Sequence, residues 1–320
     1  MVKTQTTMPK SLFLFVLFTI LTGCSTTKGK KIDDYVFSRK KERKEYISSY
    51  NKALQLWKVP FEEQYVPTKF GKAHIIVAGP KEAKALILLH GMDASSTMWY
   101  PNIASLSKNH RVYAIDFLME AGKSESPKSL LSKEEIISWY NEIFDYYKLK
   151  KYDVVGASRG GWIATLLALQ ENSKMDKLVL VSPAQTFDNI DQINKASSAF
   201  FLKLFPNKKK LKKTLEAFAY YPNKINPVYK NQFYLANKYS KSNTSLLQMQ
   251  PFSEEDLKKI KIPVFVLIGD NDVINSEKSL LRANEFLGNV KTETIQKAGH
   301  FLSIDQAEEV NKKIIAFLNK

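Results

Sequence analysis

The chain has 320 residues, of which 44% are hydrophobic and 25% charged, as expected for a globular protein with one large α/β domain or two small ones. Its 48 Lys and Arg against 32 Asp and Glu give a net charge of +16, which favours anionic surfaces. The lysines are scattered apart from a cluster at 208–213, and no aromatic–basic platform or reading helix is present, so we expect no nucleic-acid partner.

The first 31 residues have the features of an export signal followed by a tether. A basic start precedes an apolar run of about eleven residues, too short to span a bilayer. The segment Leu21–Cys24 resembles a bacterial lipobox. The resemblance implies that residues 1–23 are a lipoprotein signal peptide and that Cys24, the only cysteine, carries the lipid. Residues 24–31 would then tether an exported protein to the extracytoplasmic face of a membrane; the alternative is an uncleaved anchor or a chance cysteine.

Residues 32–60 have helix-like content, with a basic run at 39–41 that is either a solvated helix face or a contact with anionic headgroups. From residue 61 the pattern turns extended, and two strands flank Phe70-Gly71-Lys72, which predicts a hairpin. His74 lies in the second of these strands and is interpreted as a strand residue, not a catalytic one.

Short apolar runs that alternate with helical stretches predict a parallel, doubly wound sheet. The predicted strands are Ala85–Leu89, Val112–Ile115, Val154–Val155, Leu178–Val181, Val264–Ile268 and Thr292–Ile295. The predicted helices are Met98–Leu106, Glu134–Tyr147, Trp162–Leu169 and, to close the chain, about Asp305–Leu318. The alternation of strands and helices is interrupted at residues 184–251, which are rich in Phe, Tyr, Lys and Asn. This composition predicts a helical cap inserted between core segments 61–183 and 252–320.

A G-x-S-x-G pattern, Gly156-Ala157-Ser158-Arg159-Gly160, follows one of these strands and begins a helix. The turn is expected to be too tight for side chains at Gly156 and Gly160, so that Ser158 is held in a strained backbone conformation with its hydroxyl exposed. The helix that starts there would direct backbone N–H groups at the same place. An ordinary strand–turn–helix with a Ser N-cap is the alternative.

Polar groups follow other predicted strands as well, and the carboxyl ends of parallel strands meet at one edge of a sheet. The order Ser158, Asp272, His300 is the nucleophile–acid–base order of α/β-hydrolases. The chain resembles this family over nearly all of residues 61–320, and in particular its bacterial carboxylesterases. The matching motifs are H-G-M at 90–92, M-W-Y-P-N at 98–102, R-V-Y-A-I-D at 111–116, G-A-S-R-G-G at 156–161, G-x-x-D at 269–272 and G-H-F-L at 299–302.

The resemblance implies that Ser158 is the nucleophile, His300 its general base and Asp272 the residue that orients the imidazole. The backbone N–H groups of Met92 and Arg159 would form the oxyanion hole. Such chemistry needs no metal and no organic cofactor. Asp270 lies in the same loop as Asp272 and competes with it, although the G-x-x-D spacing favours Asp272.

Three further positions bear on the site. His90 is interpreted as structural support for the oxyanion loop, and the Arg159 side chain either contacts a substrate acid or forms a salt bridge under the cap. Many relatives have a D-x-x-G-x-G-x-S turn after the strand that ends at Asp116, whereas here Met119 replaces the first glycine.

We therefore expect a membrane-tethered, monomeric serine hydrolase that cleaves small ester-type substrates through an acyl-enzyme. One alternative keeps the three side chains but changes the bond, as in a peptidase, lactonase or thioesterase. Another is a non-catalytic ligand-binding or interaction lipoprotein built on the same fold, because a fold alone does not dictate function.

Overall fold

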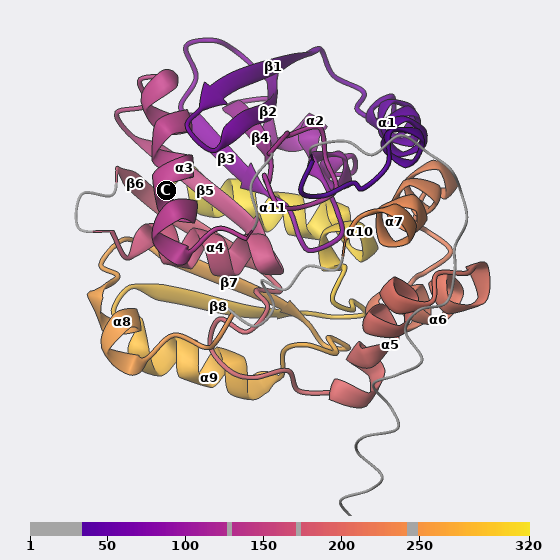
Figure 1. Ribbon diagram of the computed structural model, residues 1–320. Helices are drawn as coiled ribbons and strands as arrows, with labels where there is room; N and C mark the ends of the chain where they lie inside the picture. The colour runs from indigo at the N-terminus through magenta and orange to yellow at the C-terminus, as the bar shows by residue number, and fades with distance from the viewer. Residues whose placement is uncertain (1–33, 127–129, 171–173, 242–248) are drawn as a thin grey trace, which may run out of the picture.

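The computed structural model describes residues 34–126, 130–170, 174–241 and 249–320. The predicted signal peptide, with the lipobox-like segment and Cys24, lies outside these ranges. The described part is built on one eight-stranded sheet with the order β1-β2-β4-β3-β5-β6-β7-β8 (Figure 1). The strands are β1 Phe61–Thr68, β2 Gly71–Ala78, β3 Ala85–Leu89, β4 Arg111–Asp116, β5 Tyr152–Ala157, β6 Met175–Val181, β7 Val264–Gly269 and β8 Val290–Ile295. The hairpin β1–β2 is antiparallel and pairs antiparallel with β4, whereas all pairings from β4 to β8 are parallel. The predicted hairpin and mostly parallel sheet are confirmed.

Helices cover both faces of the sheet (Figure 1). They are α1 Lys40–Leu54, α2 Ile103–Leu106, α3 Lys133–Tyr146, α4 Arg159–Ala168, α5 Ile193–Leu204, α6 Lys208–Phe218, α7 Pro227–Tyr239, α8 Glu254–Lys259, α9 Glu277–Phe286, α10 Leu302–Asp305 and α11 Ala307–Leu318. Alternate residues of a strand enter different cores: in β3, Ile87 and Leu89 pack with α3 and α4, while Leu86 and Leu88 pack with α2 and α11. Burial on both faces is why β3 is apolar at every position.

The stretch predicted as one helix over Met98–Leu106 is divided in two. A 3₁₀ turn, η3 Ser96–Trp99, is followed by the separate α2. Pro101 lies between them and has no N–H to donate, so it cannot continue the hydrogen-bond pattern of a single helix. The single-helix prediction was therefore wrong at a position where the sequence carried the signal.

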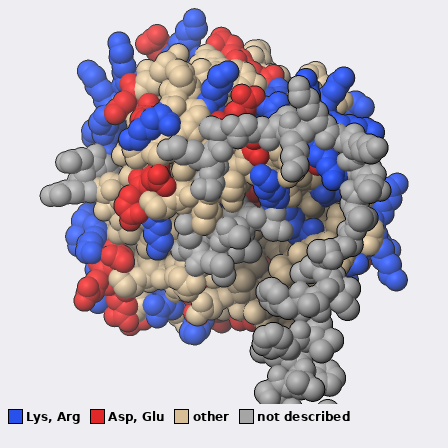
Figure 2. Space-filling model, in the orientation of Figure 1, with Lys and Arg blue, Asp and Glu red and all other residues tan. Residues whose placement is uncertain are grey.

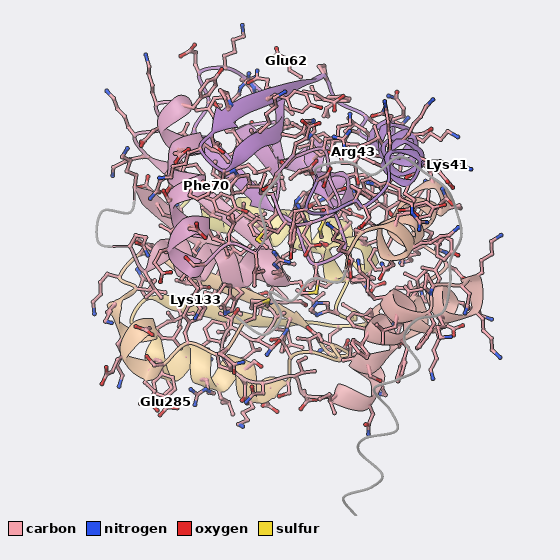
Figure 3. All side chains as sticks on the ribbon, in the orientation of Figure 1. Lys41, Arg43, Glu62, Phe70, Lys133 and Glu285 are labelled. Atoms are coloured by element: carbon pink, nitrogen blue, oxygen red, sulfur yellow. The ribbon has the colours of Figure 1, made fainter. Side chains whose placement is uncertain are left out.

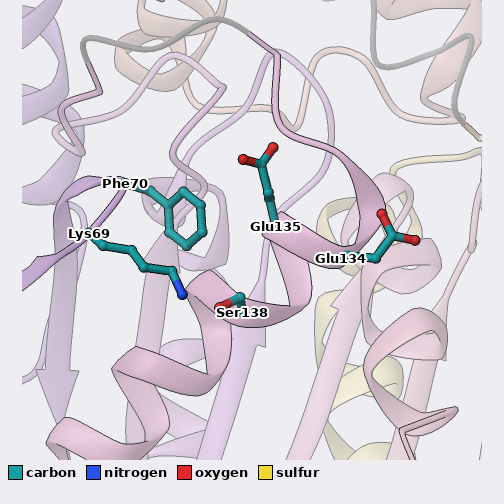
Figure 4. A pocket seen from close by; sticks show the side chains of 5 residues that line it. All are labelled: Lys69, Phe70, Glu134, Glu135 and Ser138. Atoms are coloured by element: carbon teal, nitrogen blue, oxygen red, sulfur yellow. The ribbon is translucent and has the colours of Figure 1, made fainter.

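The start of α3 shows how the sequence specifies a helix boundary. Ser132 and Glu135 form a reciprocal capping box, and Glu134 adds a second negative charge to the first turn. These glutamates line a shallow surface pocket with Lys69, Phe70 and Ser138 (Figure 4). The two glutamates stabilise the helix end.

Helices α5, α6 and α7 lie together at one side of the sheet, with α1 packed against α7 (Figure 1). Arg43 of α1, labelled in Figure 3, forms ion pairs with Asp34 and Glu125. The pair with Glu125 fixes the N-terminal helix to the loop that follows β4. No helix in the described ranges is both long and apolar enough to cross a bilayer.

Candidate active site

The turn between β5 and α4 is strained in the way its sequence predicts. Ser158 has φ 52° and ψ −119°, a conformation that non-glycine residues rarely adopt. A Cβ added to Gly156 would lie 2.4 Å from the Gly160 carbonyl oxygen, and one added to Gly160 would lie 2.2 Å from the Leu89 carbonyl oxygen. Only glycine fits at either position, and this allows the tight turn. Ser158 lies at the tip of the turn, and its side chain is partly exposed.

The structure brings together Ser158, Asp272 and His300 from three loops at the carboxyl edge of the sheet. His300 Nε2 lies 2.9 Å from Ser158 Oγ, and His300 Nδ1 lies 2.9 Å from Asp272 Oδ1. A carboxylate accepts hydrogen bonds only, so in the neutral ring Nδ1 carries the proton and Nε2 faces the hydroxyl as an acceptor. This tautomer is the one in which the ring can take a proton from serine.

Asp272 is fully buried and held on both oxygens. The Ile274 N–H donates to Oδ1 at 2.8 Å and the Asn275 amide donates to Oδ2 at 3.0 Å. Burial raises the pKa of Asp272, but His300 and these hydrogen bonds outweigh it and hold the pKa below its usual value. Asp270, the competing acid, is exposed and accepts instead from the Ala298 N–H at 3.0 Å. Of the two, only Asp272 contacts His300.

The turn after β3 lies directly against the serine. A Cβ added to Gly91 would be 3.2 Å from Ser158 Cβ, so the glycine allows this approach. His90 holds the turn: its Nε2 accepts from the Phe117 N–H at 2.9 Å and its Nδ1 donates to the Gly91 carbonyl at 2.8 Å. Burial lowers the pKa of His90, which keeps the ring neutral as these two bonds require.

Arg159, the first residue of α4, directly follows Ser158, and Met92 follows Gly91, the glycine that lies against Ser158. The backbone N–H of neither residue is among the hydrogen bonds that connect the residues described by the structure. Both are therefore available to an oxygen atom placed next to Ser158.

The side chain of Arg159 forms a salt bridge with Glu120, and each side chain is 3% exposed. Of the two interpretations of this side chain, the salt bridge is the one observed. The other oxygen of Glu120 accepts from the Asp93 N–H at 3.1 Å. One carboxylate therefore holds the residue after Met92 and the residue after Ser158, which are the two backbone segments beside the serine.

Two contacts tie loops of the site to residues 184–251, which include α5, α6 and α7. Lys203 of α5 lies 2.6 Å from Asp93 Oδ1, so the cap is linked by charge to the β3 turn. Asp305, which is buried, accepts from the N–H groups of Gly299, Tyr220 and Tyr221 at 2.8–2.9 Å. It fixes the histidine loop to the chain leaving α6.

Sequence reasoning missed Glu120, Asp93 and Asp305 as supports of the site. The Met119 departure is accommodated in the core: the residue is 3% exposed and its sulfur accepts from the Leu131 N–H at 3.3 Å. Gly122 is retained because a Cβ there would lie 2.9 Å from the Asp116 side chain.

The family sequence model described as alpha/beta hydrolase fold matches residues 84–307. The chain belongs to the α/β-hydrolase fold family. This hydrolase is 30% identical over 279 residues to carboxylesterase YbfK of Bacillus subtilis, covering 85% of this chain and 93% of that one. It is 31% identical over 284 residues to the uncharacterized carboxylesterase nap of the same organism, covering 86% and 92%. A solved structure, the naproxen esterase (carboxylesterase NP) from Bacillus subtilis, superposes with a TM-score of 0.80 at 30% identity, covering 85% of the hydrolase and 96% of the esterase chain.

Proposed function

We propose that this hydrolase cleaves carboxylic esters by a serine mechanism. The observation that carries the proposal is the continuous contact from Asp272 through His300 to Ser158, in a chain whose relatives at about 30% identity are carboxylesterases. A serine hydroxyl is a poor nucleophile unless an adjacent base removes its proton.

In the proposed reaction, Ser158 Oγ attacks the ester carbonyl while His300 Nε2 takes its proton. The Met92 and Arg159 N–H groups stabilise the developing oxyanion, each by about 3 kcal/mol. His300 then gives its proton to the departing alcohol, and water activated by the same nitrogen releases the acid from the acyl-enzyme. Asp272 keeps the imidazole in the required tautomer and stabilises its charged form.

The surroundings of the imidazole favour esters with an apolar or aromatic part. Phe218 of α6 meets His300 edge-on at 5.5 Å between ring centroids, and Phe301 also packs on Phe218. Ala196, Val273 and Ile274 complete a small apolar cluster with Phe218. Binding of an acyl chain there would be stabilised by about 25 cal/mol for each Å² of apolar surface buried.

The test is turnover of a series of p-nitrophenyl esters by the full-length chain in detergent. We expect measurable turnover that increases from acetate to longer acyl groups, and none above background in Ser158→Ala. A folded wild-type chain without turnover on the whole series, or a Ser158→Ala variant with full activity, would overturn the proposal.

We further propose that Cys24 carries a lipid that anchors the enzyme to the membrane after removal of residues 1–23, as the lipobox resemblance implies. The chain would be expressed in a bacterial host fed an alkyne analogue of palmitate. Labelling of wild type and its loss in Cys24→Ser support the anchor, and equal labelling of the two contradicts it.

A further inference from the structure

The outer face of α5 carries three exposed apolar side chains, one in the first turn and two near the end of the helix. Ile193, Phe200 and Leu204 are 66%, 56% and 44% exposed. Their spacing of seven and four residues places them on one side of a helix. Leu202 lies half a turn from this side and is completely buried, so the helix already has its apolar anchor to the core.

The exposed apolar surface continues past the end of α5. Phe201 is 48% exposed and Phe205, the residue after the helix, is 60% exposed. Single apolar residues are common on protein surfaces, whereas a contiguous group of this kind marks a site that contacts another apolar phase. We define the cap ridge as Ile193, Phe200, Phe201, Leu204 and Phe205.

Lysines border the cap ridge. Helix α6 begins three residues after Phe205 with the sequence K-K-K-L-K-K, and Lys208, Lys209, Lys212 and Lys213 are all exposed. The side chain of Lys210 lies 5.5 Å from the centre of the Phe205 ring, which places positive charge directly beside the ridge. Thr214, Leu215 and Phe218 occupy the opposite, buried side of α6.

The cap holds most of the excess positive charge of the chain. Residues 193–241 contain 11 lysines and a single acid, Glu216, so they contribute +10 of the net +16. In Figure 2, Lys and Arg side chains border the edge of the molecule where α5, α6 and α7 lie. A second copy of this chain is a poor match for the ridge, because two such faces would repel each other.

We propose that the cap ridge and the α6 lysines form a docking surface for an anionic phospholipid bilayer. Aromatic and aliphatic side chains on one face of a helix enter the boundary between headgroups and acyl chains, and adjacent lysines bind the anionic headgroups. Because α6 runs from these lysines to Phe218, which packs on His300, docking turns the carboxyl edge of the sheet toward the bilayer. The surface is independent of a lipid on Cys24.

The first test measures insertion at the ridge itself in the full-length chain. The four native tryptophans, Trp57, Trp99, Trp139 and Trp162, are all buried, so an added tryptophan reports its own surroundings. Phe200→Trp is compared with the matched control Leu281→Trp on α9, which replaces a residue of similar exposure at 60%. Vesicles of phosphatidylcholine and phosphatidylglycerol containing brominated lipid should quench the tryptophan at 200 at least about twice as strongly as the one at 281.

The second test measures the role of charge. Lys208→Glu, Lys209→Glu and Lys213→Glu are introduced together in the Phe200→Trp background. The control carries Lys81→Glu, Lys108→Glu and Lys150→Glu, which precede β3, β4 and β5 and therefore lie at the opposite edge of the sheet. Loss of three lysines from the ridge border should weaken the vesicle-dependent quenching at 200 by about 100-fold in lipid concentration, while the control changes it little.

Equal quenching at 200 and 281, or equal effects of the two lysine sets, would overturn the proposal. So would a blue shift of the tryptophan at 200 that depends on protein concentration without vesicles, since this would identify a second copy as the occupant. Neither test involves turnover, so their failure is separate from failure of the proposed function.

Discussion

Two buried histidines, His300 and His74, each have Nδ1 2.9 Å from an aspartate oxygen, and the group at the other nitrogen distinguishes them. At His300 it is the Ser158 hydroxyl, whereas at His74 it is the Glu63 carboxylate, also 2.9 Å away. A hydroxyl can give its proton to a neutral imidazole. A second carboxylate instead requires a second N–H and so favours the charged ring.

We call His74, Glu63 and Asp116 the His74 cluster; the two carboxylates and the ring shift one another's pKa values. Burial lowers the pKa of His74, but Asp116 and Glu63 outweigh it and raise the pKa above its usual value. Burial raises the pKa of Asp116, yet the His74 ring holds it well below the usual range. His74 is thus an ionic link between β1, β2 and β4, and the same pair of residue types serves as a base or as a structural ion pair according to the third group.

Replacing each histidine in turn should give the largest difference between the role of a base, at His300, and that of a structural ion pair, at His74. In His300→Gln the proposed nucleophile loses its base, and we expect kcat on p-nitrophenyl butyrate to fall by about 10⁴-fold or more. In His74→Gln we expect kcat of the folded enzyme within about threefold of wild type, because the ring touches no reacting group. Equal losses in the two folded variants would contradict the distinction.

The aspartates at the proposed site can be separated in the same way. Asp272→Asn leaves the shape intact but no longer favours the tautomer with a proton on Nδ1, so kcat should fall by about 10³- to 10⁴-fold. The control is Asp270→Asn, two residues away and exposed, with an expected change below about fivefold. A larger loss of kcat in Asp270→Asn than in Asp272→Asn would show that Asp270, not Asp272, is the acid.

Glu120 offers a smaller and more specific test, because it contacts both backbone segments beside Ser158. In Glu120→Gln the buried Arg159 guanidinium loses its counter-charge and the two segments shift. We expect kcat to fall by about 10- to 100-fold with KM changed less, since an oxyanion contact acts mainly in the transition state. The matched control is Glu216→Gln on α6. An unchanged kcat in the folded fraction of Glu120→Gln would restrict Glu120 to a role in stability.

The His74 cluster should reveal itself in stability rather than turnover. A folded-state pKa raised above 6.5 means that the ring stabilises the protein fully below pH 6.5 and that this contribution is lost as pH rises through the raised value. The pKa of Glu63 is lowered from 4.5, so its contribution is lost in acid. The stability difference between wild type and His74→Gln should therefore be greatest between pH 4.5 and 6.5, at about 3 kcal/mol. Urea unfolding across pH measures it; a difference that grows at higher pH would contradict the charge assignment.

Features of the backbone could be predicted from the sequence where neighbouring residues determine them. The strain at Ser158 follows from two glycines that leave no room for side chains, and the buried strands follow from uninterrupted apolar runs. That the loops after β3, β5, β7 and β8 meet at one edge followed from parallel strand order.

The supports of the site could not be predicted because their partners are distant in sequence. Glu120 lies 39 residues from Arg159, and Asp305 lies 85 residues from Tyr220. A polar residue in a loop has no periodicity that reveals its partner. His74 was placed correctly in a strand, but its contact with Asp116 depends on the register of β2 against β4, which no local pattern specifies.

The proposed activation of Ser158 by His300 and Asp272 is tested most directly by reacting the full-length chain with a fluorophosphonate and mapping the modified peptide by mass spectrometry. We predict a single adduct, on Ser158, and at least about 10³-fold slower modification of His300→Gln under the same conditions. A folded wild-type chain that stays unmodified, carries the adduct elsewhere, or reacts no faster than His300→Gln would contradict the assignment of these side chains to one catalytic unit.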